Sequence, residues 1–219
     1  MKKRVVFLVL VCISAALSAQ SIKVGGGGNF TANFDTFAPT EDGKEFFKDR
    51  NTHMLGGGIY AFFDLTYLEF NAGVLFGNFN WDNTDDLSDE EKKGVNITAL
   101  KLGLFGKFPI AMGAFTLFPM LGIDGQMFIN GKYMDEDIEA EDGRKMWNQF
   151  WFKAGVGLDI PLPAGGGKVF LRPEFLYGIR MNTDDEKDVL DEVKDADPKV
   201  LNAIIGHGLD LKLAIGYSF

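Results

Sequence analysis

The feature that most constrains the fold of this chain is where its charged residues stand relative to a period-two pattern. Eight segments alternate apolar and polar residues, which is typical of β-strands with one apolar face. They cover about residues 22–34, 54–63, 67–81, 95–108, 115–129, 147–160, 169–181 and 206–219. Each charged residue within them lies on the polar face. The pattern therefore predicts strands whose other face contacts an apolar environment.

The segment 169–181 illustrates the alternation, with Leu171 and Phe175 on one face and Arg172 and Glu174 on the other. Residues 54–63 are so rich in glycine that the sequence does not determine which of them share a face. The segments are about 10–15 residues long, and a tilted strand needs ~9–11 residues to cross the hydrocarbon of a bilayer.

The N-terminus has the organisation of a signal peptide, predicted as residues 1–19 and removed from the mature chain 20–219. Lys2, Lys3 and Arg4 precede an apolar run, Val5–Ile13, and small residues follow up to Ala19. The single cysteine, Cys12, belongs to this segment. A disulfide framework is therefore excluded from the mature chain, and Val11 before Cys12 argues against a lipid anchor.

The connections between the segments alternate in length. Three are short, near 64–66, 109–113 and 161–168, and four are long, at about 35–53, 82–94, 131–146 and 182–205. The long connections hold 25 of the 31 acidic residues but only 11 basic residues. The formal charge of −9 becomes −12 once the three N-terminal bases are removed, which argues against a nucleic-acid partner.

Five acidic and seven basic residues remain on the polar faces of the segments. They are Lys23, Glu69, Lys101, Lys107, Asp124, Lys153, Asp159, Arg172, Glu174, Arg180, Asp210 and Lys212. In a barrel that spans a membrane these residues face the lumen, because Arg or Lys on the lipid face costs ~2–4 kcal/mol at the midplane. They would form either a salt-bridged plug, which the narrow lumen of eight strands favours, or the lining of a narrow pore with a small excess of positive charge. In a soluble barrel of the lipocalin kind the same residues would face water around an apolar cavity.

The end of the chain helps to choose between these alternatives. Its last eight residues run from Lys212 to Phe219, with aromatic residues at Tyr217 and Phe219. They resemble the C-terminal assembly signal of outer-membrane β-barrels, apart from Ala214 where glycine is usual. Short turns at one end and long loops at the other are also the asymmetry of such barrels.

The mature chain thus resembles the small eight-stranded barrels of the OmpA/OmpX/OmpW type. The resemblance implies an all-β fold, an eight-stranded antiparallel up-and-down transmembrane β-barrel with long extracellular loops. It implies the cell outer membrane as location, with membrane lipid and the barrel assembly machinery as partners and a monomeric state. Because the sequence stops at the last strand, we expect no periplasmic wall-binding domain.

Several residues could have a catalytic or ligand-binding role instead of a structural one. His53 or His207 with Asp210 could imitate the rim sites of outer-membrane enzymes, but no nucleophile motif accompanies them. The aromatic residues near strand ends are interpreted as interfacial girdles, with a stacking platform for a sugar or an apolar ligand as the alternative. They are Tyr67, Phe79, Trp81, Trp147, Trp151, Tyr177, Tyr217 and Phe219.

The acidic clusters at 82–91 and 135–142 could bind divalent cations through oxygen ligands. Neither has the spacing of an EF-hand, and solvated loops that repel one another are the simpler interpretation. A short helix is predicted within 185–194. The sequence predicts no catalytic residue, metal site or cofactor.

The favoured function is a non-enzymatic outer-membrane barrel that acts in envelope structure or in surface interaction through acidic loops, which could meet host molecules or divalent cations. A narrow porin-like channel for small solutes is the first alternative. The soluble lipocalin-like ligand-binding barrel is the second.

Overall fold

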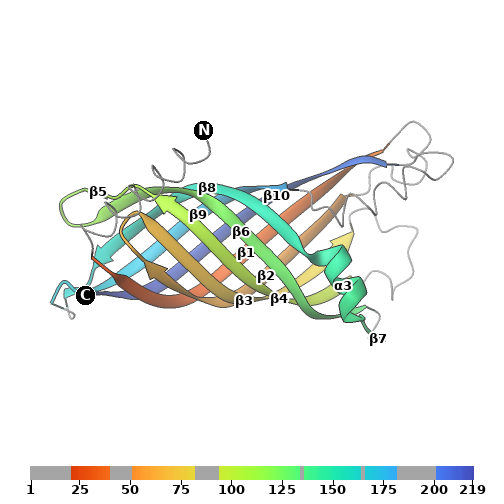
Figure 1. The fold of residues 1–219 in the computed structure, drawn as a ribbon, viewed down its shortest axis with the longest axis horizontal. Coiled ribbons are helices and arrows are strands. Elements are labelled where there is room, and N and C mark those ends of the chain that lie inside the picture. Colours follow the sequence, from red (N-terminus) through yellow and green to blue (C-terminus); the bar gives the residue numbers. More distant parts are fainter. Residues whose placement is uncertain (1–20, 40–50, 82–93, 134–135, 164–165, 182–200) are drawn as a thin grey trace, which may run out of the picture.

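The computed structural model describes residues 21–39, 51–81, 94–133, 136–163, 166–181 and 201–219. Eight long antiparallel strands form a closed barrel (Figure 1). They are β1 (Lys23–Pro39), β2 (Asn51–Asp64), β3 (Leu68–Trp81), β4 (Val95–Lys107), β6 (Thr116–Tyr133), β8 (Gln149–Pro161), β9 (Val169–Met181) and β10 (Leu201–Ser218). The predicted fold class and strand number are confirmed.

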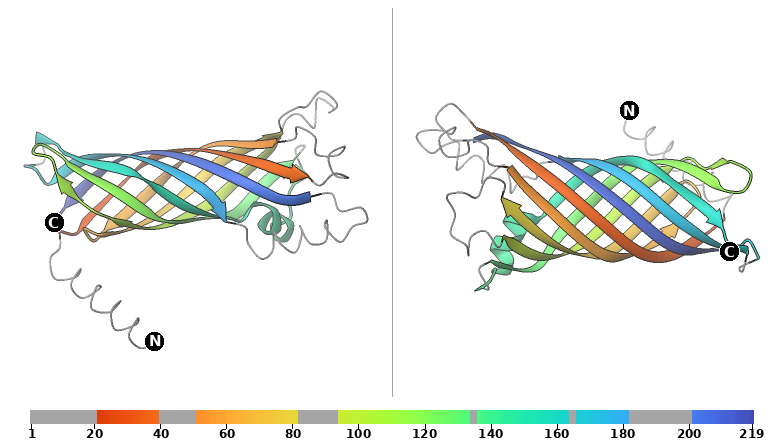
Figure 2. Two further views of the ribbon diagram at one scale, coloured as in Figure 1. Left: turned by 90° about the horizontal axis from the view of Figure 1, so that it is seen from above. Right: turned by 180° about the vertical axis from the view of Figure 1, so that it is seen from behind.

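Each long strand pairs with its neighbours along the chain, and β1 pairs with β10 to close the barrel. Two strands of two residues each, β5 (Ile110–Ala111) and β7 (Glu136–Asp137), pair with opposite ends of β6. The described helix, α3 (Ala140–Trp147), lies at one end of the barrel (Figures 1 and 2). We call this the long-loop end, and the opposite end, which holds the chain's C-terminus and the β2–β3 and β8–β9 connections, the short-turn end.

The strand boundaries follow the predicted segments, but four strands extend into connections that were predicted to be loops. β1 continues to Pro39, β2 begins at Asn51, β6 continues to Tyr133 and β10 begins at Leu201. Trp147, predicted to start a strand, is instead the last residue of α3, and the rest of this helix lies in a connection predicted to be a loop. The helix predicted within 185–194 lies outside the described residues.

The structure also sets the phase of β2. Met54, Tyr60 and Phe62 are buried, whereas Leu55 and Ile59 are exposed. Glycine in β2 allows close strand approach: a Cβ atom on Gly58 would lie 1.9 Å from the carbonyl oxygen of Val74 on β3. The glycine run that hides the alternation from sequence inspection therefore has a packing role.

The two faces of the barrel wall have inverted polarity relative to a soluble protein. Large apolar side chains cover the outside, as illustrated by Ile59, which is 68% exposed, and Leu213, which is 54% exposed. The charged side chains lie inside, where Arg172 and Asp210 are 0% exposed. The lipocalin-like alternative requires the opposite arrangement and is wrong.

Candidate functional site

The candidate site is the lumen, and its charged residues contact one another across the barrel. Arg172 on β9 reaches Glu69 on β3, two strands that are not neighbours in the sheet. A contact between such strands has to cross the interior. The structure places the twelve polar-face residues predicted from the sequence inside the barrel and joins each of them to at least one oppositely charged partner.

Two acidic residues were missed in that prediction. Asp64 was assigned to a turn but is the last residue of β2 and is 0% exposed. Asp35 was assigned to a long loop but lies within β1, is 4% exposed, and accepts a hydrogen bond of 2.6 Å from Arg180. Among the described residues the lumen therefore holds seven acids and seven bases, and the predicted excess of positive charge disappears.

The first group of lumen charges, the basal cluster, lies near the short-turn end and consists of Lys23, Asp64, Glu69, Lys107, Asp159 and Arg172. The Arg172 guanidinium is at its centre and donates to Glu69 at 2.6 Å, to Asp64 at 2.7 Å and to Asp159 at 2.6 and 2.8 Å. Lys107 donates to Asp64 and Glu69, and Lys23 to Asp159. The fork of five donors on arginine suits three carboxylates at once.

Aromatic rings surround the same guanidinium. Its central carbon lies 4.3 Å from the ring centre of Phe62, 4.9 Å from that of Phe118 and 5.0 Å from that of Phe170. Arg172 is thus held by charge-assisted hydrogen bonds along its edge and by cation–π contacts on its faces. These contacts connect β9 with β2, β3, β6 and β8 and fill the lumen at this level.

The second group, the central cluster, consists of Lys101, Asp124, Lys153 and Asp210. Lys153 donates to both carboxylates at 2.5 Å, and Lys101 donates to Asp210 at 3.1 Å and lies 3.4 Å from Asp124. The hydroxyl of Thr31 donates to Asp210 at 2.7 Å. Two ammonium groups and two carboxylates therefore neutralise one another where water has little access.

Glu174 and Lys212 lie between these clusters, with 3.7 Å separating their charged atoms. The Lys212 ammonium is also 5.1 Å from the ring centre of Tyr60 and 5.2 Å from that of Phe105. Beside them is a cavity of about 10 Å³, lined partly by Tyr60 and Asn71. A space of this size holds about one water molecule.

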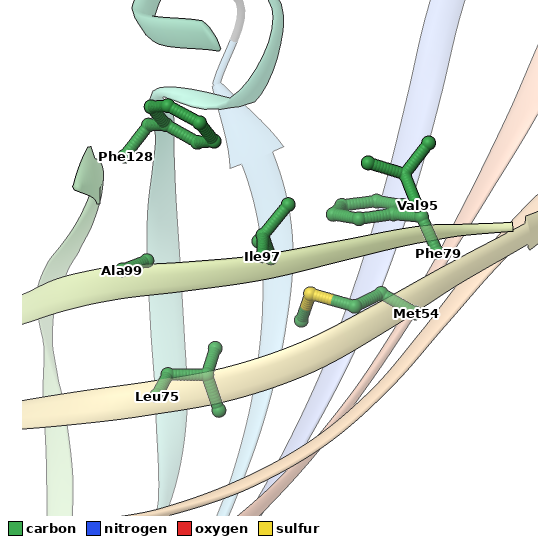
Figure 3. Close-up of a cluster of buried hydrophobic side chains, with 7 residues drawn as sticks. All are labelled: Met54, Leu75, Phe79, Val95, Ile97, Ala99 and Phe128. Atoms are coloured by element: carbon green, nitrogen blue, oxygen red, sulfur yellow. The ribbon is translucent and has the colours of Figure 1, made fainter. Parts of the chain in front are cut away.

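Toward the long-loop end the lumen also holds an apolar plug (Figure 3), and the Asp35–Arg180 ion pair lies at the same end of the barrel. Its buried members are Met54, Leu75, Phe79, Val95, Ile97, Ala99 and Phe128. Helix α3 adds Trp147, whose ring centre is 5.8 Å from that of Phe128 and 6.5 Å from that of Phe79. From the short-turn end onward the lumen thus holds the basal cluster, the central cluster and the apolar plug, with the Asp35–Arg180 pair at the long-loop end.

Helix α3 is fixed closely on the plug. The side-chain oxygen of Asn148, which follows the helix, accepts a 2.8 Å hydrogen bond from the Phe128 amide. A Cβ atom on Gly143 would lie 2.1 Å from the Phe128 ring. Glycine is unfavourable inside a helix, but here it lets the helix backbone approach the ring.

The aromatic residues predicted to form girdles divide into two sets. Tyr67, Tyr177, Tyr217 and Phe219 are exposed on the outside. Trp151 is 1% exposed and lies in the lumen with Lys153, because the two share the inward face of β8. The girdle interpretation is also wrong for Phe79 and Trp147, which belong to the plug. The Trp81 side chain lies outside the described residues.

The histidine–aspartate pairing that could have imitated a catalytic rim site does not form. His207 is on the outer face, where its Nδ1 is 2.6 Å from the Tyr177 hydroxyl, whereas Asp210 is in the central cluster. Strand alternation puts residues 207 and 210 on opposite faces. His53 pairs in register with Asn80 and Phe34 on the outer wall.

Of the two acidic clusters, 82–91 lies outside the described residues. In the second, Glu136, Asp137, Glu139 and Glu141 are exposed. The described residues contain no group of three or more His, Cys, Asp or Glu side chains placed to hold a metal ion. No helix in the described ranges is long and apolar enough to cross a membrane.

The side chains of the C-terminal residues lie on both faces of the barrel wall. Lys212 points into the lumen, while Tyr217 and Phe219 lie outside with their ring centres 5.1 Å apart. The Phe219 amide donates to the carbonyl of Ile22 at 3.0 Å, so the last residue is joined to the start of the first strand.

No protein family model and no curated protein sequence matches this chain. Among solved structures it is similar to Neisserial surface protein A, with a TM-score of 0.48 and 7% identity over 90% of this chain and 97% of that one. A major outer membrane protein of Thermus thermophilus has a TM-score of 0.42 and 15% identity, covering 88% and 99%. Ail, the attachment invasion locus protein of Yersinia pestis, has a TM-score of 0.38 and 11% identity, covering 91% and 97%.

Proposed function

We propose that this chain is a non-enzymatic barrel of the bacterial outer membrane with a closed lumen. The inverted polarity of the wall carries the proposal: apolar side chains such as Ile59 and Leu213 are exposed while fourteen charged residues lie inside. In water, an exposed apolar surface of this extent would cause the protein to aggregate. In a bilayer this apolar belt is solvated by lipid, and the closed ladder satisfies the backbone.

The contents of the lumen favour a structural or surface role over transport. An eight-stranded barrel has room inside for side chains, and here ion clusters and an apolar plug use it. We assign residues 1–19 to a signal peptide and the C-terminal aromatics to recognition by the barrel assembly machinery. The long connections, acidic in sequence, are then the surface that meets host molecules or divalent cations outside the cell.

Membrane insertion is tested on the mature chain refolded into lipid vesicles. We expect a heat-modifiable band on gels, because a closed barrel resists detergent until it is heated. A band that does not shift contradicts the membrane-barrel proposal. In planar bilayers, with a known porin as positive control, we expect no discrete conductance steps; reproducible steps would replace the closed lumen by a channel.

Orientation is tested by cysteine labelling, since the mature chain 20–219 has no cysteine of its own. A membrane-impermeant maleimide should label Asp188→Cys, in a long connection, on intact cells. The matched variant Ala111→Cys, in β5 at the short-turn end, should react only after permeabilisation. The reverse pattern contradicts the proposed orientation.

A further inference from the structure

Two hollows lie on the outer wall of the barrel, over the neighbouring strands β2, β3, β4 and β6. The one nearer the middle of the wall measures about 570 Å³. Small outward residues, Ala61 and Ala72, lie between larger ones, Phe63, Phe70 and Phe150, and all five line the hollow. We call it the apolar trough. Its depth arises because alanine leaves space that the surrounding rings do not fill.

The second hollow lies nearer the long-loop end, measures about 620 Å³ and has a different lining. Phe30, Leu55 and Phe76 form its apolar part. Its polar side chains include Asn78, Asn96, Asn130 and Lys132, and glycines and Ile97 complete the lining. We call this the amide pocket. Both hollows fall within the ~300–1,000 Å³ typical of small-ligand sites.

The two hollows follow one another along the same strands. On β2 the lining passes from Ala61 to Gly57, and on β3 from Ala72 to Phe76. Four residues of strand correspond to about 13 Å. The outer wall thus gains polar side chains along a distance suited to an amphipathic molecule.

The amide pocket lies where the apolar belt ends. Asn78 donates to Asn96 at 2.9 Å, and both are on the outer wall. His53 and Asn80 pair in register just beyond them on β2 and β3. Amide and imidazole groups of this kind belong at the level of lipid headgroups and not in the hydrocarbon.

The charge of the amide pocket selects among headgroups. Lys132 is its charged lining residue, and the asparagines supply further N–H donors. Lys132 is 3.5 Å from Asp137, and both side chains are largely exposed. An exposed pair contributes little stability, so Lys132 can pair with a phosphate while Asp137 remains near enough for an ammonium group.

We propose that these two hollows together bind one diacyl phospholipid with a phosphoethanolamine headgroup. Its phosphate contacts Lys132 and the amide pocket, and an acyl chain lies in the apolar trough. The inference rests on the proposed insertion of the barrel in a membrane, and it adds a specific lipid site to a wall that otherwise meets bulk lipid.

The test is native mass spectrometry of the refolded protein in detergent, after its heat-modifiable band has shown that it is folded. The probes are phosphatidylethanolamine and diacylglycerol with the same chains. We expect a one-to-one adduct with phosphatidylethanolamine and about tenfold less with diacylglycerol, because a charge-assisted contact is lost. Equal retention of both probes, or of neither, by the folded barrel overturns the site but leaves the membrane-barrel proposal intact.

Paired variants localise the adduct. Ala72→Phe should fill the trough and Lys132→Ala should weaken the pocket, each lowering retention of phosphatidylethanolamine about tenfold. Ala154→Phe, at an outward position of β8, and Lys168→Ala, at the short-turn end, should retain it like the wild type. A protein dimer in place of the lipid adduct, or equal loss in the control variants, also overturns the site.

Discussion

Arg172 joins three acidic residues and three aromatic rings inside the barrel. It is wholly buried, pairs with Asp64, Glu69 and Asp159, and contacts aromatic rings. Three carboxylates near one another are mutually repulsive, so its removal leaves them without their shared cation. A buried ion network is weak evidence for net stabilisation, but losing one member of it is costly.

We therefore predict that Arg172→Ala lowers the free energy of unfolding by about 3–5 kcal/mol. Arg172→Lys should recover only part of this, because one ammonium group cannot reproduce the arginine fork. Reversible unfolding of the barrel in lipid vesicles with guanidinium chloride measures both. Lys132→Ala, which removes an exposed ion pair, is the control and should change the value by less than about 1 kcal/mol. If Arg172→Ala lowers the free energy of unfolding no more than Lys132→Ala does, the ion network is dispensable for stability.

The inward or outward direction of a side chain could be predicted where apolar and polar residues alternate clearly along a strand. It could not be predicted at the ends of strands. The charges of 169–181 alternate with apolar residues, so the inward placement of Arg172, Glu174 and Arg180 could be predicted from the sequence. Asp64 ends a segment whose glycines conceal its phase, although Phe62 and Asp64 have the same parity as Tyr60. Asp35 continues the parity of Thr31 and Asn33, which was a readable signal that the first strand extends beyond Phe34.

At the scale of elements, the eight strands could be predicted and helix α3 could not. The strands are specified locally by alternation and by turn residues. The helix has eight residues, four of them acidic or basic, and gains its position from tertiary contacts of Trp147 and Gly143 with Phe128. Short helices depend on such packing more than on propensity, so sequence inspection assigns this segment to an acidic loop.

We predict that Trp147→Ala loosens the long-loop end without affecting the rest of the barrel. Two aromatic contacts are lost, each worth ~0.5–1.5 kcal/mol. Amide hydrogen exchange near Phe128 and Val95 should therefore accelerate about 5- to 150-fold, while exchange near Arg172 stays unchanged. Trp147→Phe keeps a stacking ring and should behave almost like the wild type. Uniform acceleration along β6 in Trp147→Ala would instead mean that α3 supports the whole barrel.

For the whole molecule, the sheet closes only when the last strand meets the first. β10 and β1 pair over most of their length, from Lys23 opposite Ser218 to Pro39 opposite Leu201. Closure removes both sheet edges, which matters in lipid because unpaired backbone groups there are costly. The inverted polarity and the closed sheet are mutually consistent, since charges can be tolerated only in an interior that the closure creates.

A variant of the C-terminal aromatic residue can test assembly in the cell separately from the stability of the finished barrel. The Phe219 side chain is 71% exposed, while its backbone amide bonds to Ile22. We predict that Phe219→Ala lowers the free energy of unfolding of the refolded barrel by about 1–3 kcal/mol through lost lipid contact, and that Phe108→Ala lowers it by a similar amount. In cells the same variant should reduce the amount of heat-modifiable barrel in the outer membrane severalfold, because the resemblance of residues 212–219 to an assembly signal assigns this ring to recognition. Phe108→Ala is the matched control, since Phe108 is also near the short-turn end and is 63% exposed. If both variants assemble like the wild type, or if both fail alike, the C-terminal residues act only as strand and not as signal.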